Sequence, residues 1–453
     1  MKIIIAGAGR VGASLAEALC EEGHDISVID SDADTINHVA SDADVICIEG
    51  SITDSDVLKE AGAEDADLLI ASAMEDEVNL VCGISASKLG TKNVIARVRE
   101  PEYLGKTQFL QDTFGISLAV NPEFECAKEI SRILRFPGAS RVDSFSKGSA
   151  EIVECRVNKG SPIDGTAIKD LYQKTGAKFL ISLVERGGKT IIPNGSTVLQ
   201  EEDKLSITGA PNELKKLFSA VGAYKKPTRS VIIVGGGRMT VYLTRMLCEL
   251  GISVSVIEND RNRCDRLCEL IPDARIICGD ATKSDVLLEE KIHSADAFVA
   301  LTDNDGNNII TAMYAHNCGV AKTIVKVDHE HFADMIEDSP LDSVIIPKDV
   351  VTQQIIRYVR ALNDSSDSGG IETLYKLADG DAEAIEFRVT DETGFIGIPL
   401  KDLVLKPNVL FAGIIRDNKF IVPDGSTEIR SGDNAVVVTT AGWLKNANDI
   451  LKK

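Results

Sequence analysis

Two stretches of the chain share one pattern of hydrophobic and polar positions. Residues 2–6 (KIIIA) form an apolar run of strand length, a glycine-rich turn follows, and Val11, Leu15 and Leu19 then recur at helical spacing. The pattern returns at SVIIVGGGRMT, which starts at Ser230. It predicts a strand, a tight turn and a helix at both places.

The first turn matches a dinucleotide-binding fingerprint, Gly7-x-Gly9-x-x-Gly12. The first glycine permits the turn, the second lets a pyrophosphate approach the backbone, and the third lets helix and strand pack closely. A phosphate would then lie on the unpaired N–H groups at the positive end of the helix. The motif therefore predicts a nucleotide site at this turn.

An acid follows at the spacing that the fingerprint requires. Residues 25–30 (DISVID) predict a second strand that ends in Asp30, roughly twenty residues after the glycines, where ribose hydroxyls would lie. A carboxylate accepts hydrogen bonds from those hydroxyls and repels a 2′-phosphate. We therefore expect Asp30 to hold the ribose.

The pattern that follows alternates strands with helices. Further strands are predicted at 45–48, 68–71, 94–98 and 118–120, and this alternation is typical of a Rossmann-like, doubly wound parallel sheet. A new composition begins after Pro137 and Gly138. From Ile152 the chain alternates at period two and includes a hairpin with glycines at its turn, so we expect a small α+β domain after the first sheet.

Both predicted domains are then repeated, so the chain is a duplication of the two-domain unit. Gly7 maps onto Gly235 and Asp30 onto Glu258 at one offset of 228 residues. The fold class is therefore α/β, a tandem duplication of a Rossmann-like doubly wound parallel sheet domain plus a small α+β domain. The expected domains are residues 1–138, 150–222, 229–362 and 371–453, with the polar stretches YKKPTR and NDSSDSGG as linkers.

Candidate ligand-binding residues of the first copy lie at the carboxyl edge of the sheet, where Rossmann-type ligands bind. Of Arg97 and Arg99, which lie at the end of one predicted strand, we favour Arg99 for a phosphate because it is nearer the carboxyl end. The full set is Gly7, Ala8, Gly9, Arg10, Val11, Gly12, Asp30, Ser51, Ile52, Thr53, Ala73, Met74 and Arg99.

The second copy departs from the first at three places. Its third glycine is Thr240, so its helix must stand slightly further from the strand; Arg99 aligns with Asp328, and Glu123 aligns with Lys348. We hypothesise that the second site binds a nucleotide more weakly, prefers one with less phosphate charge, or is empty. Its candidate residues are Gly235, Gly236, Gly237, Arg238, Met239, Glu258 and Asp280.

Composition narrows the function classes. The formal net charge of −21 disfavours binding to nucleic acid or, by charge alone, to an anionic bilayer, and no uncharged apolar stretch reaches the ~18 residues of a membrane span. The ten cysteines include no CxxC pair, and Cys264 and Cys268 share one face of a predicted helix. We expect reduced thiols and a cytoplasmic protein.

No catalytic constellation accompanies the glycine motifs. An NAD-dependent oxidoreductase usually needs a general acid or base beside the cofactor, often histidine. There is no histidine between His38 and His293 and none after His331. Lys or Tyr could substitute, so an oxidoreductase stays the alternative, but we expect a protein that is not an enzyme.

With two glycine-fingerprint domains, two small domains and REPEY after Val98, the chain resembles the TrkA family. Its members are cytosolic regulatory subunits of potassium uptake systems, built from paired RCK (regulator of potassium conductance) domains. The resemblance implies NAD(H) and/or ATP/ADP as ligands and a homo-oligomeric gating ring. It also implies a TrkH-type membrane potassium-translocating subunit as partner, which would hold the chain at the inner face of the membrane.

The resemblance also assigns roles to residues. It implies that Gly7 to Val11 form the nucleotide loop, Asp30 holds the ribose, Ala73 and Met74 edge the pocket, and Arg99 meets phosphate. In related single-unit subunits a glutamate binds an interface cation beside the nucleotide, and Glu123 is the matching candidate for a metal here. A freestanding nucleotide sensor with a different partner has the same sites and stays open.

Overall fold

The computed structural model describes the chain except residues 101–102, 104–106, 137, 159, 222–227, 337–338, 364–369, 441–443, 445 and 453. Most of both expected linkers, Pro137 and two residues of REPEY therefore lie outside the described residues. The chain divides into two compact units. The first comprises Met1–Ala127, Val327–Glu330 and Ile345–Ile356, and the second Lys128–Lys326, His331–Val344 and Arg357–Lys453.

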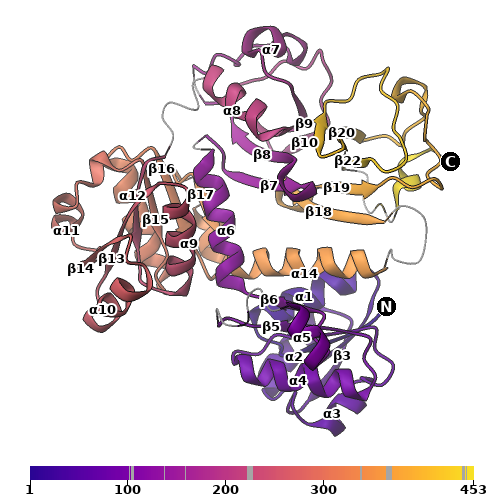
Figure 1. Ribbon diagram of the computed structural model, residues 1–453, viewed down its shortest axis with the longest axis vertical. Coiled ribbons are helices and arrows are strands. Elements are labelled where there is room, and N and C mark those ends of the chain that lie inside the picture. Colours follow the sequence, from indigo (N-terminus) through magenta and orange to yellow (C-terminus); the bar gives the residue numbers. More distant parts are fainter. Residues whose placement is uncertain are drawn as a thin grey trace. The chain divides into compact units, whose positions relative to one another are not determined.

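The first unit contains a six-stranded sheet in the order β3-β2-β1-β4-β5-β6. Its strands β3, β5 and β6 are labelled among helices α1 to α5 in Figure 1. All its strand pairs are parallel, and the order is that of a doubly wound dinucleotide-binding sheet. Its strands are β1 (Lys2–Ala6), β2 (Asp25–Asp30), β3 (Ile46–Glu49), β4 (Leu68–Ala71), β5 (Asn93–Arg97) and β6 (Leu118–Val120). The helices that follow them are α1 (Arg10–Glu21), α2 (Ala33–Asp42), α3 (Ser55–Glu60), α4 (Asp76–Leu89), α5 (Thr107–Phe114) and α6 (Pro122–Arg135).

The second unit repeats this sheet in the order β14-β13-β12-β15-β16-β17. Its strands are β12 (Ser230–Val234), β13 (Ser253–Glu258), β14 (Arg275–Cys278), β15 (Ala297–Ala300), β16 (Lys322–Lys326) and β17 (Ser343–Ile345). The helices that follow the strands are α9 (Arg238–Glu249), α10 (Arg261–Leu270), α11 (Ser284–Glu289), α12 (Asp305–Asn317), α13 (Glu330–Met335) and α14 (Pro347–Asn363). The predicted duplication of the Rossmann-like sheet is confirmed.

Two antiparallel five-stranded sheets form the small domains. The first sheet is built from β7 (Arg141–Phe145), β8 (Ala150–Arg156), β9 (Phe179–Arg186), β10 (Lys189–Ile191) and β11 (Lys204–Gly209), with helices α7 (Ile168–Thr175) and α8 (Pro211–Ala220). The second is built from β18 (Ile371–Leu377), β19 (Ala382–Arg388), β20 (Val409–Arg416), β21 (Lys419–Ile421) and β22 (Asn434–Thr439). The predicted first hairpin joins β9 to β10 through Gly187 and Gly188, whose φ angles of +57° and +71° suit a tight hairpin turn.

The two small domains share a hydrophobic core within the second unit. Phe145 and Leu183 of the first domain pack with Tyr375 and Val436 of the second. The rings of Phe145 and Tyr375 meet edge to face at 5.1 Å, and the Tyr375 hydroxyl donates to the Ser144 carbonyl at 2.6 Å. The apolar faces of the two sheets therefore cover each other.

A charged cluster lies beside this core, where α6 and α14 enter the second unit. Arg141 pairs with Asp143 at 2.8 Å, and the guanidinium of Arg357 lies 4.7 Å from the centre of the Tyr375 ring. Burial raises the pKa of Glu129 to about 7. The surrounding charges act on it in both directions, because Arg141, Arg132 and Arg357 lower its pKa while Asp143 raises it.

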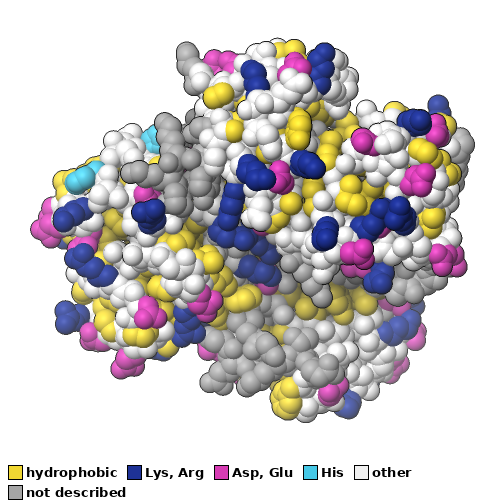
Figure 2. Space-filling model, turned by 45° about the horizontal axis from the view of Figure 1, so that its top comes forward, with side chains coloured by type: hydrophobic (Ala, Val, Ile, Leu, Met, Phe, Trp, Pro, Cys, Tyr) yellow, Lys and Arg dark blue, Asp and Glu magenta, His cyan; other side chains and the backbone are white. Residues whose placement is uncertain are grey.

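Among the described residues, no helix is both long and apolar enough to span a bilayer. The face drawn in Figure 2 carries acidic, basic and hydrophobic side chains interspersed with one another.

The raised pKa of Glu129 predicts a pH-dependent stability. Between its ordinary value of 4.5 and about 7, the folded chain holds this proton more tightly than the unfolded chain, so the free energy of unfolding falls as pH rises through that window. We expect Glu129→Gln to stabilise the protein by roughly 1–3 kcal/mol at pH 8 and by much less at pH 5. Urea midpoints at the two pH values measure this.

The exposed Glu201 supplies the matched control. Glu201→Gln should leave the midpoint nearly unchanged at both pH values. An equal stabilisation by Glu129→Gln at pH 5 and pH 8 would contradict the raised pKa of Glu129.

Candidate functional site

The first glycine loop owes its shape to close contacts. Gly7 has a φ of +103°, and a Cβ there would lie 2.9 Å from the Ala73 nitrogen. A Cβ at Gly12 would lie 1.9 Å from the Gly7 carbonyl oxygen, so helix α1 packs directly on the loop. Gly9 differs, because no described atom lies within 4 Å of its ideal Cβ position. The fold requires Gly7 and Gly12, whereas Gly9 leaves room for a ligand.

Asp30 joins the end of β2 to this loop. Its Oδ2 accepts the Ala8 N–H at 2.7 Å, and its Oδ1 accepts the Asp32 N–H at 3.0 Å. Each carboxylate oxygen has a second lone pair, so both can still accept a ribose hydroxyl. The acid therefore positions the loop and keeps acceptor capacity for a ligand.

Asn79 shapes the opposite edge of the site, and sequence reasoning did not assign it a role. Its amide accepts the Ala73 N–H at 2.8 Å and donates to the carbonyls of Ala73 and Arg97, both at 2.9 Å. Asn308 repeats this arrangement in the second copy, with Thr302 and Lys326 in place of Ala73 and Arg97. The sequence signals this shared role, because the asparagine recurs at an offset of 229 residues.

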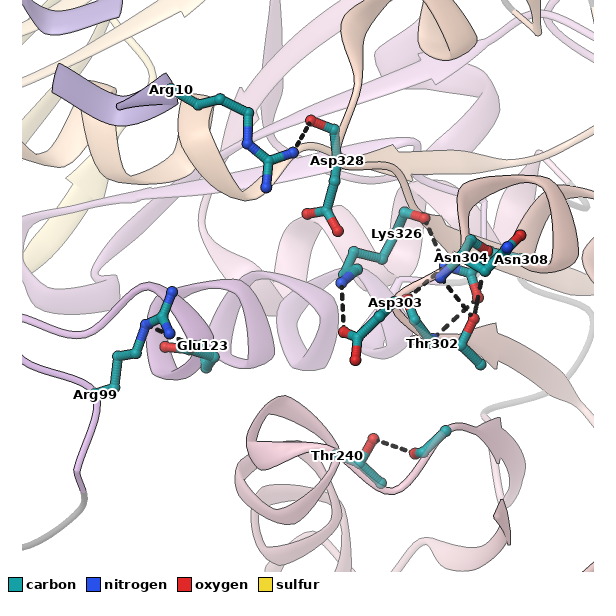
Figure 3. Close-up of polar contacts among 11 residues, drawn as sticks. Arg10, Arg99, Glu123, Thr240, Thr302, Asp303, Asn304, Asn308, Lys326 and Asp328 are labelled. Atoms are coloured by element: carbon teal, nitrogen blue, oxygen red, sulfur yellow. Dashed lines mark hydrogen bonds and ion pairs between the residues drawn. The ribbon is translucent and has the colours of Figure 1, made fainter. Parts of the chain in front are cut away.

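Three arginines of the first unit lie near the same carboxyl edge. The Nε of Arg99 lies 3.4 Å from Glu123 Oε1, so the expected phosphate residue and the expected metal residue pair with each other (Figure 3). Arg97 is partly buried, and desolvation together with the nearby charge of Arg99 lowers its pKa. Its Nε has no hydrogen-bond partner among the described residues. Arg10 donates to the Asp328 carbonyl at 3.0 Å.

Arg99 is placed by Asp76, at the start of α4. The buried Asp76 carboxylate accepts the N–H groups of Arg99 and Glu100, both at 2.8 Å. β5 ends at Arg97 rather than at the predicted residue 98, so Arg99 lies in a loop beyond the strand.

The other expected residues divide by exposure. Ser51 and Thr53 share a hydrogen bond of 2.9 Å between their hydroxyls at the exposed end of β3. Met74 is 77% exposed. Ile52 lies in the hydrophobic core, so only its backbone can face a ligand. Val11 is half-buried on the first turn of α1.

The second glycine loop replaces one hydrogen-bond donor by another. In the first copy the Ser72 hydroxyl donates to the Gly7 carbonyl at 2.8 Å. In the second copy Leu301 stands at the position of Ser72, and the buried Thr240 hydroxyl donates to the Gly235 carbonyl at 2.6 Å (Figure 3). A side chain thus fits on this helix where none fits in the first copy.

A cavity of about 320 Å³ opens at the carboxyl edge of the second sheet. This volume is in the range of small-molecule sites. Five of the seven residues expected for the second site line it, namely Gly235, Gly236, Gly237, Glu258 and Asp280. Arg238 is exposed outside the lining, and Met239 is buried in the core.

Acidic groups dominate the charge of this cavity. Glu258, Asp280 and Asp303 line it, and Arg263 is the cation among its lining residues. Glu258 Oε2 accepts the Gly236 N–H at 2.6 Å, as Asp30 accepts the Ala8 N–H in the first copy. Lys326, which stands at the position of Arg97, lies 3.6 Å from Asp303 (Figure 3).

Family models match both halves of the duplication. A TrkA-N domain matches residues 3–122 and 231–347, and a TrkA-C domain matches residues 152–222 and 384–452. The chain belongs to the TrkA family. It is 34% identical over 452 residues to a "Trk system potassium uptake protein TrkA homolog" of Archaeoglobus fulgidus, with 100% of both chains covered.

A second TrkA relative, from Vibrio alginolyticus, is 31% identical, with 96% of this chain and 95% of the relative covered. Among solved structures, the GsuK RCK domain matches with a TM-score of 0.61 at 21% identity, over 97% of this chain and 92% of that chain. The structure titled "GsuK channel bound to NAD" matches with a TM-score of 0.61 at 20% identity, over 97% and 76%. These matches show the RCK fold in this TrkA chain.

A metal at Glu123 stays a prediction. Among the described residues, no group of three His, Cys, Asp or Glu side chains could hold a metal ion. Glu123 Oε2 is buried and has no hydrogen-bond partner among the described residues.

The hydrogen bond that Thr240 donates to the second glycine loop predicts that its removal lowers the free energy of unfolding. Thr240→Val keeps the side-chain shape but leaves the Gly235 carbonyl without its 2.6 Å hydrogen bond. We expect a loss of about 1–3 kcal/mol, seen as a lower urea midpoint for unfolding.

Thr244, one turn further along α9, is the matched control. Its hydroxyl is buried and has no hydrogen-bond partner among the described residues, so Thr244→Val should be neutral or stabilising. Equal losses in the two variants would show that the Thr240 hydrogen bond contributes nothing specific.

Proposed function

We propose that this chain is a nucleotide-sensing regulatory subunit that gates a membrane potassium transporter through a ring of RCK domains. The observation that carries the proposal is the presence, in a TrkA chain, of two glycine-loop sites that have different charged side chains at their edges. A sensor of the balance between two nucleotides needs sites that differ in this way.

The first site is suited to ATP or ADP. Arg10, Arg97 and Arg99 supply positive charge near a loop whose Gly9 leaves room for phosphate. The buried Nε of Arg97 would gain an acceptor, which favours an anionic ligand over water. Arg99 would exchange part of its pairing with Glu123 for a phosphate oxygen.

The second site is suited to NAD(H). Asp280 and Asp303 disfavour a dense phosphate chain, whereas a dinucleotide carries two phosphates and a second ribose. Thr302, Asn304 and Asn307 line the cavity with hydroxyl and amide groups that can bond to that ribose. The structure titled "GsuK channel bound to NAD" supports NAD(H) as a ligand for a chain of this fold.

Nucleotide exchange would act on the ring through differences in phosphate charge and length. Moving a two-state ring almost completely requires about 5.5 kcal/mol of differential affinity between its states. Charge-assisted hydrogen bonds contribute roughly 1.5–3 kcal/mol each, so a few phosphate contacts made in one ring state suffice.

The partner in this proposal is a TrkH-type potassium-translocating subunit. The relatives named as Trk system potassium uptake proteins support it, and a homo-oligomeric ring on the cytoplasmic side of the membrane follows from that role. The lining of the second cavity contains no histidine among the described residues, which favours ligand sensing over hydride-transfer chemistry.

The glycines with open space give clean tests of the two sites. Gly9→Ala and Gly237→Ala add a methyl group that meets no described atom within 4 Å, so each variant should fold normally and still obstruct a phosphate. We expect Gly9→Ala to weaken ATP binding on the order of tenfold or more and to leave NADH binding intact, with the reverse for Gly237→Ala. Isothermal titration with ATP, ADP, NAD and NADH measures this.

The two variants control for each other, because each adds the same methyl group at the same place in one copy of the duplicated loop. Two equal ATP sites in the parent chain, or an equal effect of both variants on both ligands, would contradict the division between the sites.

A further inference from the structure

Two thiols meet beside the second cavity. Cys264 lies on α10, and its Sγ donates to the Glu258 carbonyl at 3.4 Å. Cys278 ends β14 and is the cross-strand partner of that same Glu258 in the parallel register of β13 and β14. Helix α10 packs on both strands. The two cysteines are thus brought together by the residue that holds the glycine loop.

The two thiols differ in exposure and reactivity. Cys264 is buried, and desolvation with a hydrogen-bonding contact to Cys278 raises its pKa to about 12. Cys278 is exposed. Because an oxidant must reach the sulfur, the exposed Cys278 is the group that it attacks first, and the buried Cys264 is placed to respond.

The cysteine pair has no counterpart in the first copy. Ile36 and Glu49 stand at the positions of Cys264 and Cys278. A thiol reaction at this place therefore acts on the second site alone.

We propose that Cys264 and Cys278 form a redox-active dithiol, which a hydroperoxide converts to a disulfide that disables the second nucleotide site. The effect on ligand binding rests on the proposed function, whereas the thiol chemistry does not.

The reaction balances with one hydroperoxide. The Cys278 thiolate attacks the terminal peroxide oxygen, the O–O bond breaks, and Cys278 becomes a sulfenic acid while an alcohol or water leaves. The Cys264 sulfur then attacks the Cys278 sulfur, the S–O bond breaks, and the Cys264 proton leaves with the hydroxide as water. Two thiols are oxidised and one peroxide is reduced.

Disulfide formation would alter the cavity through its wall. The sulfur atoms must come to about 2.05 Å, which takes the Cys264 donor away from the Glu258 carbonyl and draws α10 toward β14. Gly279 and Asp280 follow Cys278 directly and line the cavity. Leu267 of α10 lies against the Gly236 position. Affinity for a nucleotide should therefore fall on the order of tenfold.

The test treats the full chain with hydrogen peroxide, blocks the remaining thiols and identifies cross-linked peptides by mass spectrometry. We expect a Cys264–Cys278 disulfide, with free thiols falling from ten to eight and returning with dithiothreitol. Cys278→Ser should abolish the cross-link, and Cys264→Ser should stop the reaction at a sulfenic acid on Cys278. Cys268→Ser, on the same helix, should behave as the parent.

Two further readouts separate the dithiol from the nucleotide site. Hydrogen exchange should slow in residues 258–267 and 278–282 of the oxidised chain, whether or not a nucleotide binds, and NADH affinity should fall only when Cys264 and Cys278 are both present. Absence of the cross-link, or its formation between other cysteines, overturns the dithiol. If hydrogen exchange is unchanged in the cross-linked chain, the disulfide does not act on the nucleotide site. If the reduced chain binds no NADH, the proposed function is contradicted and the dithiol is not.

Discussion

The carbonyl oxygen of the first loop glycine is the constraint on which both glycine loops depend. In the first copy a helix packs so closely on this oxygen that residue 12 admits no side chain, and Ser72 donates the hydrogen bond from the neighbouring loop. In the second copy Thr240 of the helix donates it. The same backbone group is satisfied by two different solutions, and each fixes the helix that presents N–H groups to a ligand.

The two sites share their backbone arrangement and differ in their charged side chains. Both have a glycine with open space, an acid bonded to the loop, and an asparagine that joins the fourth and fifth strands of the sheet. The second copy has Lys326 in place of Arg97 and Asp303 in place of Met74. These substitutions change the charge at the carboxyl edge of its sheet. One scaffold thereby carries two differently charged glycine-loop edges, a difference that side-chain substitutions produce without altering the fold.

Much of this architecture could be predicted because it depends on local pattern. Strands at Leu68–Ala71 and Leu118–Val120 were predicted at their observed bounds, and the glycine loops follow from their spacing. The strand β7 was not predicted, because Arg141, Asp143 and Ser144 interrupt its apolar pattern. Arg141 and Ser144 bond to Lys376 and Tyr375 on a distant segment. The pairing of Arg99 with Glu123 was equally hidden, since it depends on Asp76 holding the loop that follows β5.

Nucleotide-dependent gating is tested most directly by measuring potassium flux through a TrkH-type subunit that is reconstituted in vesicles with this protein. Replacing ATP by ADP should change the flux when the parent chain is present and should have no effect when the Gly9→Ala variant is present. The same flux with either nucleotide, or a nucleotide response that persists when the protein is left out, would contradict this gating.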